Sequence, residues 1–158
     1  EDTDKFLFKH IAGSLSFLPY GALVDHFQHW VYENPKATPK ERKKQWLELE
    51  KIYQPGKKYD NLKFLKNGGF WQKQAHIYEM PFYYIDYTLA QVCAFQFWIR
   101  MQEDKESAWA DYLELCKAGG SMSFLNLVKL AKIKSPFDPK VFEEVATKIN
   151  NWLSENSL

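Results

Sequence analysis

The sequence lacks the features that mark membrane proteins and nucleic-acid-binding proteins. No run of apolar residues reaches the roughly 18–20 positions that a membrane-spanning helix needs. The 21 basic and 20 acidic side chains leave a formal net charge of +1. Such a balance provides no general field to attract nucleic acid or an anionic membrane surface. We therefore expect no nucleic-acid partner and no membrane partner.

Signals of secretion and of disulfide bonding are also scarce. The chain begins Glu1-Asp-Thr-Asp4, without an initiator Met and without the apolar core of a signal peptide. We interpret this start as that of a fragment or a processed product. The two cysteines, Cys93 and Cys116, both lie in helical apolar patterns. We expect them to be buried, reduced thiols of a cytoplasmic protein.

No complete catalytic motif is present. The zinc helix of metalloproteases needs two histidines at i and i+4 with a Glu beside the first, and no such pair occurs. In Asp25-His-Phe-Gln-His29, Asp25 and His29 have this spacing, but packing or hydrogen bonding is the favoured role. There is no Gly-x-Ser-x-Gly motif, and Gly68-Gly69 lacks the Lys-Ser/Thr of a phosphate loop. We expect this chain to hold no metal ion.

What the sequence does contain is apolar and aromatic. Apolar residues make up 46% of the chain and aromatic residues 17%, which exceeds the content of a disordered chain. Apolar positions recur at helical spacing through almost every segment, and no alternating run is long enough for a sheet. We predict an all-α, multi-helix bundle that forms a single helical domain over residues 1–158.

Several helix boundaries can be predicted. Thr38-Pro-Lys-Glu41 is a capping box with proline at the first helical position. Pro19 and Gly21 predict a break in the first helical region, and Asn67-Gly-Gly69 predicts a turn. We expect helices over about residues 5–32 with that break, 39–53, 81–101, 105–118, from Ser121 or Ser123 to about 132, and 139–153.

A row of neutral hydrogen-bond donors follows Pro81. At about 100° per residue, Tyr84, Tyr87, Thr88 and Gln91 share one side of the predicted helix. A phenol with a pKa near 10 stays protonated at neutral pH and can donate to an oxyanion. His76 precedes the helix and could donate to the same ligand. The alternative is an enclosed helix whose tyrosine hydroxyls meet backbone carbonyls, and spacing leaves both interpretations open.

The segment His76-Ile-Tyr-Glu-Met-Pro-Phe-Tyr-Tyr-Ile-Asp-Tyr-Thr-Leu-Ala-Gln91 resembles the oligoendopeptidase F branch of the thimet oligopeptidase-like zinc metallopeptidases. Further similar segments occur in the family's order: Phe17-Leu-Pro-Tyr20, Val24-Asp25, Phe27-Gln-His29, Val31-Tyr32, Thr38-Pro, Glu41-Arg42 and Gly69-Phe-Trp-Gln72. The resemblance is strong over about residues 15–100 and looser in the C-terminal helices.

This resemblance implies the C-terminal half of the catalytic domain of a cytoplasmic zinc endopeptidase that hydrolyses oligopeptides. In the family, a His-Glu-x-x-His helix and a further Glu hold zinc upstream of the segment present here. The missing N-terminal part of the enzyme would then be this chain's partner. The isolated chain is expected to be inactive, to hold no zinc and to self-associate through exposed apolar surface. The alternative is a stand-alone helical peptide-binding or structural interaction module.

The resemblance also implies roles for particular residues. His76 matches the substrate-binding histidine, and Tyr84 and Tyr87 match two tyrosines that bind substrate and the transition state. Tyr83 is a further substrate-binding candidate, and Gly68 and Gly69 resemble a mobile loop that covers the substrate. Relative to the thimet branch, the spacing from the histidine to the tyrosine pair is one residue shorter. Met80 or Pro81 also occupies the place of a further tyrosine.

Overall fold

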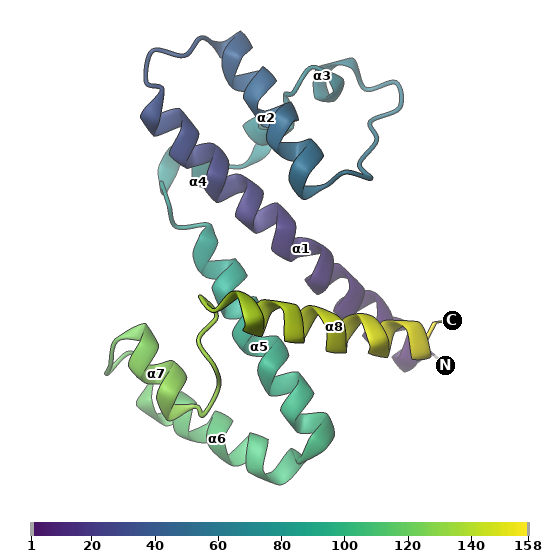
Figure 1. Cartoon of the computed structure of the whole chain (residues 1–158), viewed down its shortest axis with the longest axis vertical. Coiled ribbons are helices and arrows are strands. Elements are labelled where there is room, and N and C mark those ends of the chain that lie inside the picture. The colour runs from purple at the N-terminus through teal and green to yellow at the C-terminus, as the bar shows by residue number, and fades with distance from the viewer. Residues whose placement is uncertain (1, 158) are drawn as a thin grey trace. The chain divides into compact units, whose positions relative to one another are not determined.

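A computed structural model describes residues 2–157, which form helices joined by turns and contain no strand (Figure 1). This confirms the all-α prediction. No helix in this part of the chain is both long enough and apolar enough to cross a membrane. The elements are α1 (Asp2–Glu33), α2 (Pro39–Tyr53), α3 (Lys63–Lys66), the 3-10 helix η1 (Phe70–Lys73), α4 (His76–Glu79), α5 (Ile85–Glu103), α6 (Lys105–Ala118), α7 (Phe124–Leu130) and α8 (Pro139–Glu155).

The chain divides into two compact units. Ser16–Thr88 form the first unit, and the segments before Ser16 and after Thr88 form the second. Both boundaries fall inside helices, α1 and α5, rather than in the flexible linkers that commonly separate domains. A single helical domain over residues 1–158 therefore stays our proposal.

The predicted break at Pro19 and Gly21 is wrong, because α1 runs without interruption from Asp2 to Glu33 with Pro19 inside it. An interior proline removes one backbone hydrogen bond and costs about 3 kcal/mol. Tertiary packing outweighs this cost here, since Leu18 is fully buried and Tyr20 packs against the core of the first unit. Gly21 serves close packing instead, because a Cβ there would overlap Oγ1 of Thr88.

The core of the first unit joins α1, α2 and η1. In it, α2 packs beside the C-terminal half of α1 (Figure 1). The ring of Phe27 lies 5.2 Å from that of Trp46 and 5.1 Å from that of Trp71, measured between centroids. Leu23, Val24 and Leu49 complete the buried set. Burial of this apolar surface is the main force that holds the unit together.

The start of α2 confirms the predicted capping box. The backbone N–H of Glu41 donates to Oγ1 of Thr38 at 3.3 Å, and the N–H of Thr38 donates to Oε2 of Glu41 at 2.7 Å. Each bond satisfies a donor that the first helical turn would otherwise leave unpaired. The helix ends at Tyr53, as predicted, and Gln54 is its C-cap.

In the second unit, polar side chains of α5 hold the segments around α6 and α7. The Gln96 amide donates to the Lys134 carbonyl at 3.0 Å and accepts from the Lys134 N–H at 2.8 Å. Arg100 donates to the Ala131 carbonyl at 3.1 Å and to Asp111 at 2.5 Å. The boundaries predicted for α6 are confirmed, and α8 buries Val141, Val145 and Ile149.

Two further predictions are corrected. Helix α5 begins at Ile85 rather than Pro81. One side of it is exposed at Asp86, Ala90 and Ala94. Cys116 is exposed rather than buried, whereas Cys93 is partly buried and both thiols are free. Burial raises the pKa of the Cys93 thiol to about 11. Helical spacing predicts which residues share a side of a helix. It does not predict which side other elements cover.

Candidate functional site

His76 and three tyrosines form one aromatic group in the first unit. The His76 ring centroid lies 5.0 Å from Tyr84, 5.7 Å from Tyr87 and 6.3 Å from Tyr83. Tyr87 in turn lies 5.3 Å from Tyr83 and 5.4 Å from Tyr84. The structure therefore brings together the four aromatic residues that the sequence singled out. We call these four residues the His76 cluster.

Three consecutive pieces of chain supply the cluster. His76 is the first residue of α4, Tyr83 and Tyr84 lie in the turn before α5, and Tyr87 lies in the first turn of α5. Tyr84 is half-buried, while Tyr83 and Tyr87 are 38% and 42% exposed. The cluster is thus packed at Tyr84 and exposed at Tyr83 and Tyr87.

The polar row predicted along α5 is only partly formed. Tyr84 precedes the helix, so its position comes from the turn rather than from helical periodicity. Thr88 is buried against Gly21, and its Oγ1 has no hydrogen-bond partner in residues 2–157. Tyr87 is therefore the exposed hydroxyl-bearing residue of this first turn, and Thr88 serves packing.

Aromatic side chains of α1 support Tyr84 from behind. Its ring lies 6.0 Å from Phe17 and 5.9 Å from Tyr20, the latter in an edge-to-face arrangement. Tyr20 also contacts Phe70 of η1 at 6.0 Å and Trp46 of α2 at 6.5 Å. Edge-to-face pairs of this kind are favoured by the ring quadrupoles. Tyr84 is consequently anchored to the core of its unit.

Tyr84 and Tyr87 are neutral donors at neutral pH. Burial, and then the neighbouring Tyr87, raises the pKa of Tyr84 above its ordinary value. A hydrogen bond with Tyr83, followed by partial burial, raises the pKa of Tyr87. Both phenols therefore keep their protons and can donate to a carbonyl oxygen or an oxyanion.

A second layer of polar side chains contacts His76. Tyr20 donates its hydroxyl hydrogen bond to Oε1 of Gln74 at 2.9 Å. The Gln74 Nε2 atom lies 2.7 Å from Nδ1 of His76. Neither Tyr20 nor Gln74 has a role that we predicted from the sequence. A signal for the pair is hard to find in sequence, since 54 positions separate them.

Gly68 and Gly69 have different neighbours. Gly68 has a φ of +80°, and a Cβ there would overlap the backbone carbonyl of Lys43 on α2. A Cβ on Gly69 would overlap the ring of Phe64. Both glycines are buried, so in this structure their turn is packed against α2 and α3. The turn leads into Phe70, which contacts the site through Tyr20.

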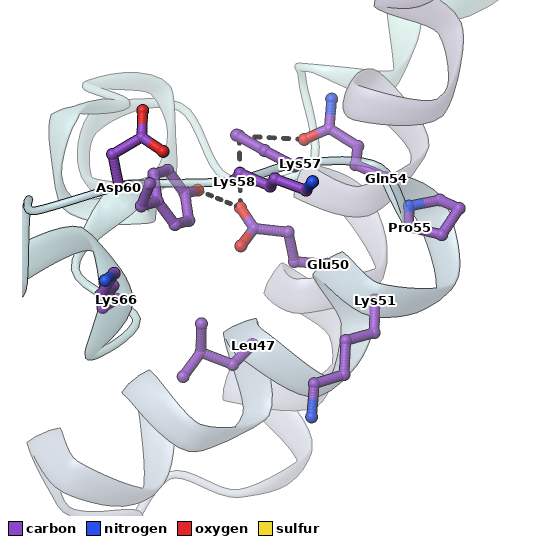
Figure 2. Close-up of a pocket in the computed structure, with 10 residues that line it drawn as sticks. Leu47, Glu50, Lys51, Gln54, Pro55, Lys57, Lys58, Asp60 and Lys66 are labelled. Carbon is purple, nitrogen blue, oxygen red and sulfur yellow. Dashed lines mark hydrogen bonds and ion pairs between the residues drawn. The ribbon is translucent and has the colours of Figure 1, made fainter.

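A buried carboxylate organises the loop that follows α2. Glu50 accepts hydrogen bonds from Trp46 at 3.1 Å and from the Tyr59 hydroxyl, and pairs with the Lys57 ammonium at 3.2 Å. Figure 2 shows Lys57 reaching both Glu50 and Gln54. The adjacent pocket of about 430 Å³ shares no lining residue with the His76 cluster. We therefore assign this network a supporting role, in which Lys57 also lies over the Phe70 ring at 3.3 Å.

The histidines outside the cluster have structural partners. His29 pairs with Asp25 at 3.4 Å, and Nδ1 of His26 lies 3.0 Å from the Tyr53 hydroxyl. Within residues 2–157, no three His, Cys, Asp or Glu side chains are grouped so that they could hold a metal ion. The described residues therefore do not provide a complete zinc site by themselves.

The chemistry available to the His76 cluster is binding. Three phenols and an imidazole offer hydrogen-bond donors and ring faces to one ligand. Such groups suit a peptide backbone, whose carbonyl oxygens are acceptors. The cluster itself contains no carboxylate and no thiol. It can therefore position a peptide and stabilise a developing negative charge on oxygen.

Comparison with known proteins identifies the family of the chain. A profile of peptidase family M3 matches residues 1–147. The chain belongs to peptidase family M3. No curated protein matches the chain, so the closer comparisons within the family are with solved structures.

Three solved structures are similar to this M3 chain. One, assigned as an oligoendopeptidase F, has 55% identity and a TM-score of 0.94 over 100% of this chain and 28% of its own. PZ peptidase A, solved with an inhibitor, has 54% identity and a TM-score of 0.94 over 98% of this chain and 28% of its own. A protein from Bacillus anthracis strain Ames, also assigned as an oligoendopeptidase F, has 45% identity and a TM-score of 0.79 over 100% of this chain and 25% of its own. The chain therefore spans little more than a quarter of these proteins.

Proposed function

We propose that this chain is the substrate-binding C-terminal part of a zinc metalloendopeptidase that hydrolyses oligopeptides. The observation that carries the proposal is the convergence of His76, Tyr83, Tyr84 and Tyr87 in one partly open cluster. Membership of peptidase family M3 supports it. A peptide is the ligand that neutral donors of this kind suit best.

In this proposal, the residues of the chain bind and orient the peptide. Tyr84 and Tyr87 donate to the oxygen of the scissile carbonyl as negative charge develops on it, and His76 donates to the same part of the substrate. Tyr83 contributes its exposed ring to the bound peptide. Gly68 and Gly69 belong to the loop that closes over the substrate, which would require their turn to separate from Lys43 and Phe64.

The remaining chemistry belongs to sequence outside this chain. Zinc and the base that activates water would be supplied by the rest of the enzyme, since the described residues offer no set of ligands. The isolated chain would then be inactive. Its exposed aromatic residues, Tyr83 and Tyr87 among them, would face substrate or the rest of the enzyme, and would promote self-association of the isolated chain.

Removing a single hydroxyl tests the proposed binding role. Tyr84→Phe and Tyr87→Phe keep the ring contacts, so the intact enzyme should still fold. A donor used in the transition state is typically worth a factor of about 10²–10³ in kcat, whereas KM should change little. Steady-state kinetics with a fluorogenic oligopeptide measure both constants. Tyr112→Phe, which removes the hydroxyl of a partly exposed tyrosine in the other unit, is the control. An unchanged kcat in both site variants would contradict the proposal.

A further inference from the structure

We propose that Tyr20 and Gln74 are positioning residues that hold His76 in the tautomer with its proton on Nε2, so that Nε2–H faces the peptide. This inference deepens the proposed function and rests on it for the identity of the ligand. The tautomer itself is a property of the protein, and it can be measured whether or not the peptidase assignment is right.

The hydrogen bonds run in one direction. The Tyr20 hydroxyl donates to Oε1 of Gln74 at 2.9 Å, so the carbonyl end of the amide points at Tyr20. The NH₂ end then points at His76, with 2.7 Å between Nε2 and Nδ1. An amide NH₂ group can donate but cannot accept. Nδ1 of His76 must therefore be the acceptor in this contact.

An acceptor role for Nδ1 decides where the ring proton lies. A neutral imidazole carries one proton, and the nitrogen that accepts a hydrogen bond is the one without it. The proton of His76 is consequently on Nε2. This atom is then a donor to a carbonyl oxygen or an oxyanion, and it cannot act as a general base at the same time.

Tyr20 is well suited to fix the amide. Its ring is packed against Trp46, Phe70 and Tyr84, so the hydroxyl has little freedom to turn toward another acceptor. Burial, followed by the neighbouring Tyr84 and Glu50, raises the pKa of Tyr20, which keeps the phenol protonated as a donor. The Gln74 backbone is also held, because its N–H donates to the Trp71 carbonyl at 3.0 Å.

The wild-type enzyme provides the first test. The intact protein is prepared with ¹⁵N-labelled histidine, and the His76 ring is assigned from the signals that His76→Gln removes. Spectra are recorded well above the ordinary histidine pKa of about 6.5, where the neutral ring prevails. We expect His76 to show a proton on Nε2 and none on Nδ1. A proton on Nδ1, or a comparable mixture of the two tautomers, would overturn the proposal.

Three variants give the second test. Gln74→Glu offers His76 only an acceptor, so a proton should appear on Nδ1. Gln74→Leu and Tyr20→Phe should each allow both tautomers. Each variant should lower kcat/KM. For Gln74→Leu the loss should be roughly 10–100-fold, as is typical when the residue that orients a metal-bound histidine is removed. Gln72→Leu, the same change at an exposed position in η1, is the control and should match wild type.

The readouts separate this inference from the proposed function. If Gln74→Glu leaves both the proton on Nε2 and the activity unchanged, the positioning role is wrong. If Gln74→Glu does not fold, the wild-type spectrum and Tyr20→Phe still decide the question. If the tautomer is as expected but Tyr84→Phe and Tyr87→Phe keep full kcat, the positioning role of Tyr20 and Gln74 stands. The proposed oxyanion role of the two tyrosines is then wrong.

Discussion

Gly21→Ala should destabilise the fold, although alanine is a better helix former than glycine. Gly21 lies inside α1, and a Cβ there would overlap Oγ1 of Thr88 and lie 3.3 Å from Cβ of Thr88. Gly13 lies in the same helix, and nothing would come within 4 Å of a Cβ added to it. Gly13→Ala therefore reports helix propensity alone, while Gly21→Ala reports propensity together with the overlap.

The expected magnitudes follow from these two terms. Alanine is favoured over glycine in a helix interior by about 0.8–1.0 kcal/mol, so Gly13→Ala should raise the free energy of unfolding by about that amount. Overpacking a tight contact typically costs about 1–3 kcal/mol. Gly21→Ala should then lower the free energy of unfolding by about 0–2 kcal/mol. The difference between the two variants isolates the overlap.

The assay is urea unfolding of the purified chain, followed by far-ultraviolet circular dichroism. Thr88→Ala is the second single variant of a double-mutant cycle. It breaks no hydrogen bond, because Thr88 Oγ1 has no partner in the described part of the chain. Gly21→Ala should therefore cost much less when Thr88 is already alanine. If Gly21→Ala stabilises the chain as much as Gly13→Ala does, the close packing of α1 on the first turn of α5 is refuted.

Two predictions concern the second unit. Hydrogen bonds from Arg100 and then Lys132 lower the pKa of Asp111 in the folded state. The stability that Asp111 contributes is therefore present above its unfolded value of about 3.9 and is lost as the pH falls through the lower folded value. Asp111→Asn should reduce the urea midpoint at neutral pH and converge with wild type in acid; a difference that is independent of pH would contradict this. The exposed Cys116 should react with iodoacetamide well before Cys93, which is partly buried and has a raised pKa. Mass spectrometry of wild type and Cys116→Ser measures the two rates, and equal rates would contradict the assignment.

Helix ends that depend on neighbouring residues could be predicted from the sequence. The start of α2 follows from Thr38 and Glu41, and the start of α8 from Asp138. The end of α6 follows from Gly119, which has a φ of +53°. Each of these signals acts within about one helical turn. The uninterrupted α1 could not be predicted, because what stabilises Pro19 in a helix is burial of side chains around it rather than local preference.

The candidate site was predictable in its residues but not in its geometry. Resemblance to a family identified His76, Tyr84 and Tyr87, and the structure places their rings together. Periodicity placed Tyr84 on a helix that in fact begins one residue later. Tyr20 and Gln74 could not be found, because their meeting depends on how α1 packs beside η1, a contact that no local pattern records.

The turn between α4 and α5 explains why helical periodicity failed at Tyr84. Phe82 has a φ of +62°, a left-handed conformation that costs a non-glycine residue roughly 1–3 kcal/mol. Its ring lies 4.8 Å from His29 and 4.9 Å from Tyr32, both on α1, and these contacts can offset the cost. A helix that ran back through Phe82 to Pro81 would lack this turn, and Tyr83 would have to leave its stacked position beside His76. Contacts with α1 thus hold Phe82 in a strained conformation that brings Tyr83 and Tyr84 to the histidine. Tertiary contacts, rather than helix propensity, determine the backbone at this turn.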